Sequence, residues 1–186
     1  MAKLVAEPFV TRFGKKLVIR SAEPKDWESI AHYMNHLKTD SAFTYQYPEQ
    51  REYTREEMEK RAQEYLDKDR ALQIAVFDQD DVVAQLSFRC FHLNEHHPWL
   101  KHNCDFGMGV VKDYWSQGIG FRLLQIMERE ARAMGYTQIF AEVRANNEAG
   151  LALYLKFGFE IVGRRKNAAL IHGRYYDDLL IQKKIN

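Results

Sequence analysis

Apolar positions along the chain change their spacing at a few points, and those changes predict the successive elements. Residues Lys16–Ser21 read as a strand. Pro24 suits a helix start, and the apolar residues beyond it recur at helical spacing: Trp27, Ile30, Ala31, Met34 and Leu37. A second helix is predicted to begin at Thr54, because Glu57 completes a capping box with it. The first third of the chain therefore reads as one strand followed by two helices.

The remaining elements are short and separated by turn residues. Ranges 72–77 and 82–90 flank a polar turn, which is the pattern of a β-hairpin. There follow a strand at about 104–111, a helix, a strand at 138–143, a helix, and a closing hairpin at 160–169 and 174–182. The predicted order is β-α-α-β-β-β-α-β-α-β-β, and the apolar residues before Lys16 are compatible with one more edge strand. We expect a single α/β (α+β) domain over residues 1–186.

The segment from Val110 to Phe121, VVKDYWSQGIGF, is the most informative part of the chain. A strand end runs into a tight loop with Gly118 and Gly120, and an apolar helical pattern begins at once. The first turn of a helix presents main-chain N–H groups that have no intrahelical partner and suit a phosphate. Glycine lets such a ligand approach where a Cβ would collide. The segment therefore indicates either a phosphate-binding loop or an ordinary strand–helix turn.

Composition narrows the classes of function. The 186 residues are 46% apolar and 13% aromatic, as in a folded domain with a sizeable core. Lys plus Arg (27) nearly balances Asp plus Glu (26), so no basic field favours nucleic acid or an anionic membrane as partner. The N-terminus lacks a signal-peptide pattern, and two cysteines are too few for a disulfide framework. We expect a cytoplasmic protein.

A second motif, NNEAGLALYLKFGF at 146–159, follows the loop after a short strand. Together the two blocks resemble the acetyl-CoA signature of the GNAT superfamily of N-acetyltransferases. The matching residues are Gly118, Ile119 and Gly120 in the first block and Asn147, Leu153, Tyr154, Gly158 and Phe159 in the second. Two positions depart from the family pattern, with Trp115 at the usual Gln/Arg position and Gly150 at the usual Ala. The joint match in order and spacing makes the resemblance specific.

The resemblance implies the GNAT fold, a central mixed and mostly antiparallel sheet with flanking helices and a parallel strand pair that splays apart. It also implies acetyl-CoA as co-substrate and no metal. The diphosphate is expected on the loop, at Ser116, Gln117, Gly118, Ile119, Gly120 and Phe121. The pantetheine arm is expected to pair with the main chain of Met108 and Val110. Asn147 is expected to cap a helix and, by the resemblance, to bond the pantetheine.

The resemblance assigns the general acid to Tyr154, because the family tyrosine points toward the sulfur of coenzyme A. A phenol of pKa about 10 is a workable proton donor to a thiolate of pKa about 8.5. The alternative is a buried aromatic in the core. Asp105 is the candidate that orients or deprotonates the amine, or else a solvated strand-end residue. Glu142 faces either the substrate or a helix, and a water relay in place of a committed base stays open.

Other polar and aromatic residues carry weaker signals. Tyr45 and Tyr47 lie between the first two helices, a segment that walls the acceptor pocket in the family, although they serve core packing equally well. Four histidines near Pro98 lack the spacing of a zinc site and read as a solvated loop.

The leading hypothesis is an acetyl-CoA-dependent N-acetyltransferase that acts by direct transfer on a primary amine of a small molecule, such as an amino acid, a polyamine or an amine antibiotic. Acetylation of a protein N-terminus or lysine is the alternative, since ribosomal-protein acetyltransferases share this style of loop. A non-catalytic module that binds coenzyme A is the third reading. A homodimer is compatible with the sequence.

Overall fold

The structure is a computed structural model that describes residues 2–40, 43, 52–91 and 97–185, with the main chain alone for 39 and 40. It divides into two compact units. The first comprises Met1–Arg89 and Gly107–Met127, and the second comprises Cys90–Phe106 and Glu128–Asn186. The expectation of one domain over the whole chain stays a prediction.

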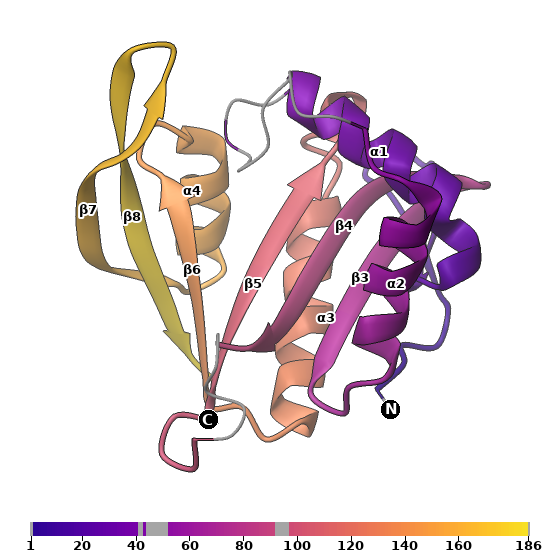
Figure 1. Cartoon of the computed structure of the whole chain (residues 1–186), viewed down its shortest axis with the longest axis horizontal. Coiled ribbons are helices and arrows are strands. Elements are labelled where there is room, and N and C mark those ends of the chain that lie inside the picture. Colours follow the sequence, from indigo (N-terminus) through magenta and orange to yellow (C-terminus); the bar gives the residue numbers. More distant parts are fainter. Residues whose placement is uncertain (1, 41–42, 44–51, 92–96, 186) are drawn as a thin grey trace. The chain divides into compact units, whose positions relative to one another are not determined.

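The first unit is built on antiparallel strands with helices on both faces. Its elements are β1 (Glu7–Val10), β2 (Lys16–Ser21), the 3-10 turn η1 (Pro24–Asp26), α1 (Trp27–Asp40), α2 (Arg55–Leu66), β3 (Ala71–Asp78), β4 (Asp81–Cys90), the end of β5 (Asn103–Val110), η3 (Lys112–Tyr114) and most of α3 (Ile119–Ala133). In Figure 1, α1 and α2 lie in front of β3 and β4, and α3 lies behind them. Apolar residues of α1 and α2, including Tyr33 and Leu37, pack on Ala75, Phe77 and Val82 of the sheet.

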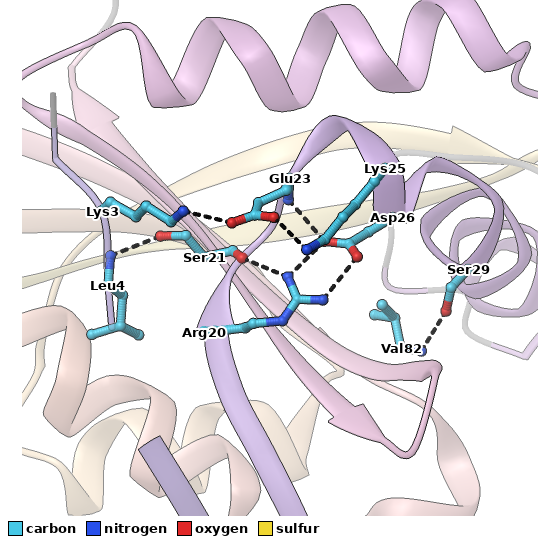
Figure 2. Close-up of polar contacts among 9 residues, drawn as sticks. All are labelled: Lys3, Leu4, Arg20, Ser21, Glu23, Lys25, Asp26, Ser29 and Val82. Atoms are coloured by element: carbon cyan, nitrogen blue, oxygen red, sulfur yellow. Dashed lines mark hydrogen bonds and ion pairs between the residues drawn. The ribbon is translucent and has the colours of Figure 1, made fainter. Parts of the chain in front are cut away.

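Polar contacts at the end of β2 fix the start of α1. Arg20 donates to both carboxylate oxygens of Asp26, at 2.7 and 2.8 Å (Figure 2). Its guanidinium also lies 3.9 Å from the ring centre of Phe77. The main-chain N–H of Val82 donates to the Ser29 hydroxyl at 2.6 Å. These contacts join the first turns of α1 to β2 and to the β3–β4 turn. They thereby set which residues of α1 face the sheet.

The second unit contains the parallel strand pair. It comprises the start of β5 (Asn103–Val110), the end of α3, β6 (Gln138–Arg144), α4 (Glu148–Lys156), β7 (Glu160–Ile171) and β8 (Arg174–Lys184), the last of which lies between β6 and β7 (Figure 1). β5 and β6 pair in parallel from Asn103–Gln138 to Asp105–Phe140, whereas β6–β8 and β7–β8 are antiparallel.

The predicted elements are confirmed. Hydrogen bonding orders eight strands as β1-β2-β3-β4-β5-β6-β8-β7, a mostly antiparallel sheet with one parallel pair. The residues before Lys16 do add an edge strand, β1. Thr54 and Glu57 form the expected capping box, and Cys90 and Cys104 are buried and not joined in a disulfide. No helix within the described residues is long and apolar enough to cross a membrane.

Candidate active site

The loop before α3 has the backbone of an anion-binding turn. Ser116 has φ 59° and Gly118 has φ 90°, both in the left-handed region. A side chain at Gly118 would be strained there, which is why glycine is required. The main-chain N–H of Arg122 donates to the Gly118 carbonyl at 3.0 Å, so the N–H groups of Ile119 and Gly120 precede the intrahelical hydrogen bonds of α3. Such groups at a helix start can accept a phosphate.

Trp115, the departure from the family pattern, joins this loop to β5. Its indole N–H donates to the Val110 carbonyl at 2.6 Å, while the side chain stays 44% exposed. Gln117 also turns inward, because its side-chain amide donates to the Asp113 carbonyl at 2.9 Å. The carbonyl of Val110, one expected partner of the pantetheine, therefore already accepts a hydrogen bond from the loop.

The β1–β2 turn, residues 11–15, contacts the same loop from the N-terminal side. The main-chain N–H of Arg12 donates to the Gln117 carbonyl at 3.2 Å. Lys15 Nζ donates to the Tyr114 hydroxyl at 2.8 Å, and that hydroxyl donates to Asp78 at 2.5 Å. Lys15 also pairs directly with Asp78. Lys15, Tyr114 and Asp78 thus each contact the other two, and Tyr114 directly precedes Trp115 in the chain.

The charges of this set are fixed at neutral pH. Hydrogen bonds from Lys15 and Tyr114 lower the pKa of Asp78, and the bond to Asp78 raises the pKa of Lys15. Burial, and then the bond to Asp78, raises the pKa of Tyr114. An ammonium, a carboxylate and a neutral phenol therefore coexist, with the phenol hydrogen directed to the carboxylate. A further pair, Arg122–Glu7 at 2.7 Å, ties the first turn of α3 to β1.

Tyr33 of α1 supports the segment of β5 that precedes the loop. Its side chain is 2% exposed, and its hydroxyl donates to the Gly109 carbonyl at 3.0 Å. Burial raises the pKa of Tyr33, and the nearby main-chain N–H of Gln85 opposes that rise. A Cβ at position 109 would lie 2.7 Å from both this hydroxyl and Leu37, so only glycine fits the close approach. Sequence analysis missed Tyr33, because helical spacing marks it as one more core residue.

Asn147 caps α4, as predicted. Its Oδ1 accepts from the main-chain N–H of Gly150 at 3.0 Å. The cap accounts for the second departure from the family pattern, since a Cβ at position 150 would lie 2.7 Å from the Asn147 side chain. The hydrogen bond of Asn147 to the pantetheine stays a prediction.

Tyr154 lies on α4 in an aromatic cluster. It is 9% exposed, and its ring meets Phe106 and Phe159 edge to face, at centroid distances of 5.6 and 5.9 Å. Its hydroxyl forms no hydrogen bond within the described part of the chain. Burial raises the pKa of Tyr154 to about 12. The phenol therefore keeps its proton at neutral pH, a state that serves a proton donor as well as a core aromatic.

The two candidate carboxylates lie on adjacent parallel strands of the second unit. Asp105 is half-buried on β5, opposite Phe140. Glu142 of β6 accepts from Arg165 of β7 at 2.7 Å, so it lies next to a basic strand residue, which neither expected placement foresaw. The roles of both carboxylates stay predictions.

A buried ion pair at the end of β6 escaped sequence analysis. Arg144 Nη1 lies 2.7 Å from Asp178 Oδ1, with side-chain exposures of 5% and 2%. The two residues are directly opposite in the β6–β8 ladder, and the next residue, Ala145, donates to the Asp177 carbonyl. The pair fixes where β6 ends, three residues before the Asn147 cap. The pairing of distant strands that creates it leaves no local signal in the sequence.

The predictions for two tyrosines and four histidines concern residues that the structure describes only in part. Tyr45 and Tyr47 lie outside the described residues. Of the four histidines, His97 packs edge-on against Trp99 and His102 accepts from Thr137 through its carbonyl, and the other two are not described. No group of three or more His, Cys, Asp or Glu side chains that could hold a metal occurs in the described ranges.

Fold and loop geometry together define a class of acetyl-group transferases, and comparison with known proteins identifies it. The model of the acetyltransferase (GNAT) domain family matches residues 19–180, so the chain belongs to this family. The chain is similar to the acetyltransferase of the GNAT family from Streptococcus pneumoniae, with a TM-score of 0.83, 26% identity, and coverage of 91% of this chain and 99% of that one. The resemblance seen in the sequence is confirmed.

Two curated relatives point to different acceptors. The chain is 27% identical to the L-amino acid N-acetyltransferase AaaT of Escherichia coli (strain K12) over 164 residues. The aligned stretch covers 87% of this chain and 94% of that relative. Similarity to the ribosomal protein bS18-alanine N-acetyltransferase of the same strain is 38% identity over 71 residues, 38% of this chain. The chain thus spans less than half, 43%, of the length of the latter relative.

Proposed function

We propose that this protein is an acetyl-CoA-dependent N-acetyltransferase that acts by direct transfer on a primary amine of a small molecule. The observation that carries the proposal is the loop at 116–121, whose left-handed Ser116 and Gly118 lead straight into the start of α3. Main-chain donors there suit the diphosphate of coenzyme A. Binding energy from this remote group positions the thioester for attack.

In the proposed reaction the amine nitrogen attacks the thioester carbonyl, the C–S bond breaks as the C–N bond forms, and the thiolate takes a proton. Tyr154 supplies that proton or a hydrogen bond, because its buried phenol remains protonated at neutral pH. Asp105 or a water molecule accepts the proton that the amine loses. No metal enters this proposal.

A small-molecule acceptor is favoured by the similarity to AaaT along nearly the whole of both chains. Acetylation of a protein N-terminus is the second candidate, which the higher identity to the bS18-alanine enzyme over a shorter stretch favours. Thiol release in the presence of free amino acids, polyamines, aminoglycosides and short peptides separates the two. We expect turnover with free amines and none with peptides.

Calorimetry with coenzyme A tests the loop directly. Gly118→Ala should weaken binding, because alanine cannot hold φ 90° without strain. Gly135→Ala is the matched control, since Gly135 also has positive φ, 78°, and a Cβ there would meet nothing within 4 Å. Equal affinity in wild type and Gly118→Ala would contradict the assignment of the loop. Binding without thiol release by any amine or peptide would instead favour a non-catalytic module.

A further inference from the structure

Two glutamine side chains in the first unit hold buried atoms that the described residues leave unsatisfied. Gln73 of β3 is 3% exposed, and Gln85 of β4 is 6% exposed. Gln73 Oε1 and Gln85 Nε2 have no hydrogen-bond partner within the described part of the chain. Buried amide atoms in native proteins are nearly always paired, so an orphaned acceptor and an orphaned donor in adjacent strands indicate a missing polar partner.

Both amides face the same side of the sheet. The β3–β4 register pairs Gln73 with Ser87 and Ala75 with Gln85. Residues directly opposite each other in an antiparallel ladder share a face, and residues two apart on one strand share it as well. Ala75 packs in the cluster that includes Tyr33 of α1. Gln73, Ser87 and Gln85 therefore lie on the face that α1 and α2 cover.

The third strand of this face is β5. The Val111 N–H donates to the Val83 carbonyl at 2.9 Å, and the Phe91 N–H donates to the Asn103 carbonyl at 3.2 Å, so β4 and β5 run antiparallel in a fixed register. Gly109 is thus opposite Gln85, and Gly107, two residues earlier, is opposite the half-buried Ser87.

On this face, side chains of α1 cover the row of opposite residues that contains Gln85 and Gly109. The neighbouring row, which contains Ser87 and Gly107, is open at Gly107. At Gly109 an added Cβ would meet Leu37 and Tyr33 at 2.7 Å, whereas at the exposed Gly107 it would meet nothing within 4 Å. The row Gln73–Ser87–Gly107 is therefore open at its Gly107 end, on β5, while Gln73 at its other end is buried, and Gln85 lies in the adjacent row. Each glutamine amide stands on three rotatable bonds, so it can turn toward that space.

We propose that Gln73, Gln85 and Ser87 form the floor of the acceptor-binding site and select α-amino acids among small amines. The inference rests on the proposed function and names its substrate class. Gln85 Nε2 donates to the carboxylate of the acceptor, a charge-assisted hydrogen bond. Gln73 Oε1 accepts an N–H of the neutral amine and orients its lone pair. A polyamine would leave the Gln85 donor unpaired, because it carries no acceptor group beside its amines.

The test compares amino acids with the amines that lack only the carboxylate, namely histidine with histamine, tyrosine with tyramine and phenylalanine with phenethylamine. Wild type should prefer the amino acid of each pair. Gln85→Leu should raise KM for the amino acid about tenfold, as expected for one lost charge-assisted hydrogen bond, and leave KM for the amine and for acetyl-CoA unchanged. Gln73→Leu should raise KM for both members of each pair. Gln125→Leu, at an exposed site on α3, is the control.

Melting temperature separates this role from a structural one. If the orphaned atoms await a substrate, leucine removes a desolvated amide and the melting temperature of Gln85→Leu holds or rises. A fall in melting temperature with KM unchanged would overturn the proposal, since the amide would then have a structural partner. An equal rise in KM for amino acid and amine would overturn it as well.

A readout without turnover keeps the two proposals distinct. In the presence of coenzyme A, the amino acids but not the amines should raise the melting temperature of wild type, and Gln85→Leu should lose that rise. Wild type could bind coenzyme A and show this difference between amino acids and amines, yet release no thiol. The proposed activity would then be wrong, while the role of Gln73, Gln85 and Ser87 in binding amino acids would be supported. If amines are acetylated with no preference for a carboxylate, the proposed activity is supported and the proposed selection of amino acids by these residues is wrong.

Discussion

The hydroxyl of Tyr33 donates a 3.0 Å hydrogen bond to the carbonyl of Gly109, and this contact ties α1 to β5 just before the loop. The position of α1 is itself set at its first turn by Arg20 and Asp26. A helix that sequence analysis assigns to the core therefore also supports the strand that is expected to pair with the pantetheine.

Tyr33→Phe should weaken both stability and cofactor binding. The ring remains, so packing is kept, but the Gly109 carbonyl loses its hydrogen-bond donor, a loss of about 1–3 kcal/mol in the free energy of unfolding. We expect a lower urea midpoint and a higher KM for acetyl-CoA. Tyr65→Phe on α2, at a half-buried site, should change neither quantity. An unchanged KM with lowered stability would restrict Tyr33 to a structural role.

The contacts of the β1–β2 turn predict that an N-terminal element tunes cofactor affinity. Lys15→Met and Tyr114→Phe each remove a hydrogen bond of the set with Asp78, and they should raise KM for acetyl-CoA about threefold to tenfold with kcat kept. The exposed Lys16, the first residue of β2, supplies the charge-matched control Lys16→Met. If the control raises KM as much, overall charge rather than the contact explains the effect.

The cap of α4 predicts a coupling between two neighbouring positions. Asn147→Ala should cost about 1 kcal/mol of stability, the usual effect of losing an N-cap. Gly150→Ala in wild type gains helix propensity but crowds the Asn147 side chain at 2.7 Å. In the Asn147→Ala background the crowding is gone, so the same change should stabilise by about 0.5–1 kcal/mol. Urea unfolding of the four proteins measures the coupling, and strictly additive effects would contradict the steric account.

The raised pKa of Tyr154 predicts a loss of stability in alkali. The phenol releases its proton at the ordinary pKa of 10.0 in the unfolded chain but at about 12 in the folded one. The contribution of Tyr154 is therefore fully present below pH 10 and is lost as pH rises toward 12. Between about pH 10 and about pH 11 wild type should lose about 1 kcal/mol more than Tyr154→Phe.

The same residue allows a separate test of catalysis. If Tyr154 is the proton donor, Tyr154→Phe lowers kcat by a factor that stays constant from neutral pH to about pH 10, because the phenol does not titrate in that range. Coenzyme A affinity, measured by calorimetry, serves as the control for folding of the site. Full turnover by Tyr154→Phe would leave Tyr154 as a core aromatic.

Local pattern made most of the fold predictable. The capping box at Thr54 and Glu57, the polar turn between β3 and β4, and the glycines of the loop before α3 are signals carried by residues a few positions apart. Such signals depend on local backbone geometry, so they can be recognised without knowing which distant residues pack against them. The family resemblance extended them to the coenzyme A site.

Side-chain partners on other strands and helices were not predictable in this way. The contact of Glu142 with Arg165 required the placement of β7, and the buried Arg144–Asp178 pair required the β6–β8 register. The sequence showed Trp115 only as a departure from the family pattern. The structure shows that its indole N–H donates to the Val110 carbonyl.

The sequence by itself determined the order of the elements, the glycine-containing loop before α3 and the family, because periodicity, turn residues and motif spacing are local properties. Only the tertiary structure decided that Tyr33 of α1 donates to the Gly109 carbonyl of β5, and that the N-terminal turn contacts the loop. It also placed two unsatisfied glutamine amides on one face of the sheet. Hydrogen bonding and burial depend on which distant residues meet, and that is fixed only when the strands pair and the helices pack on them.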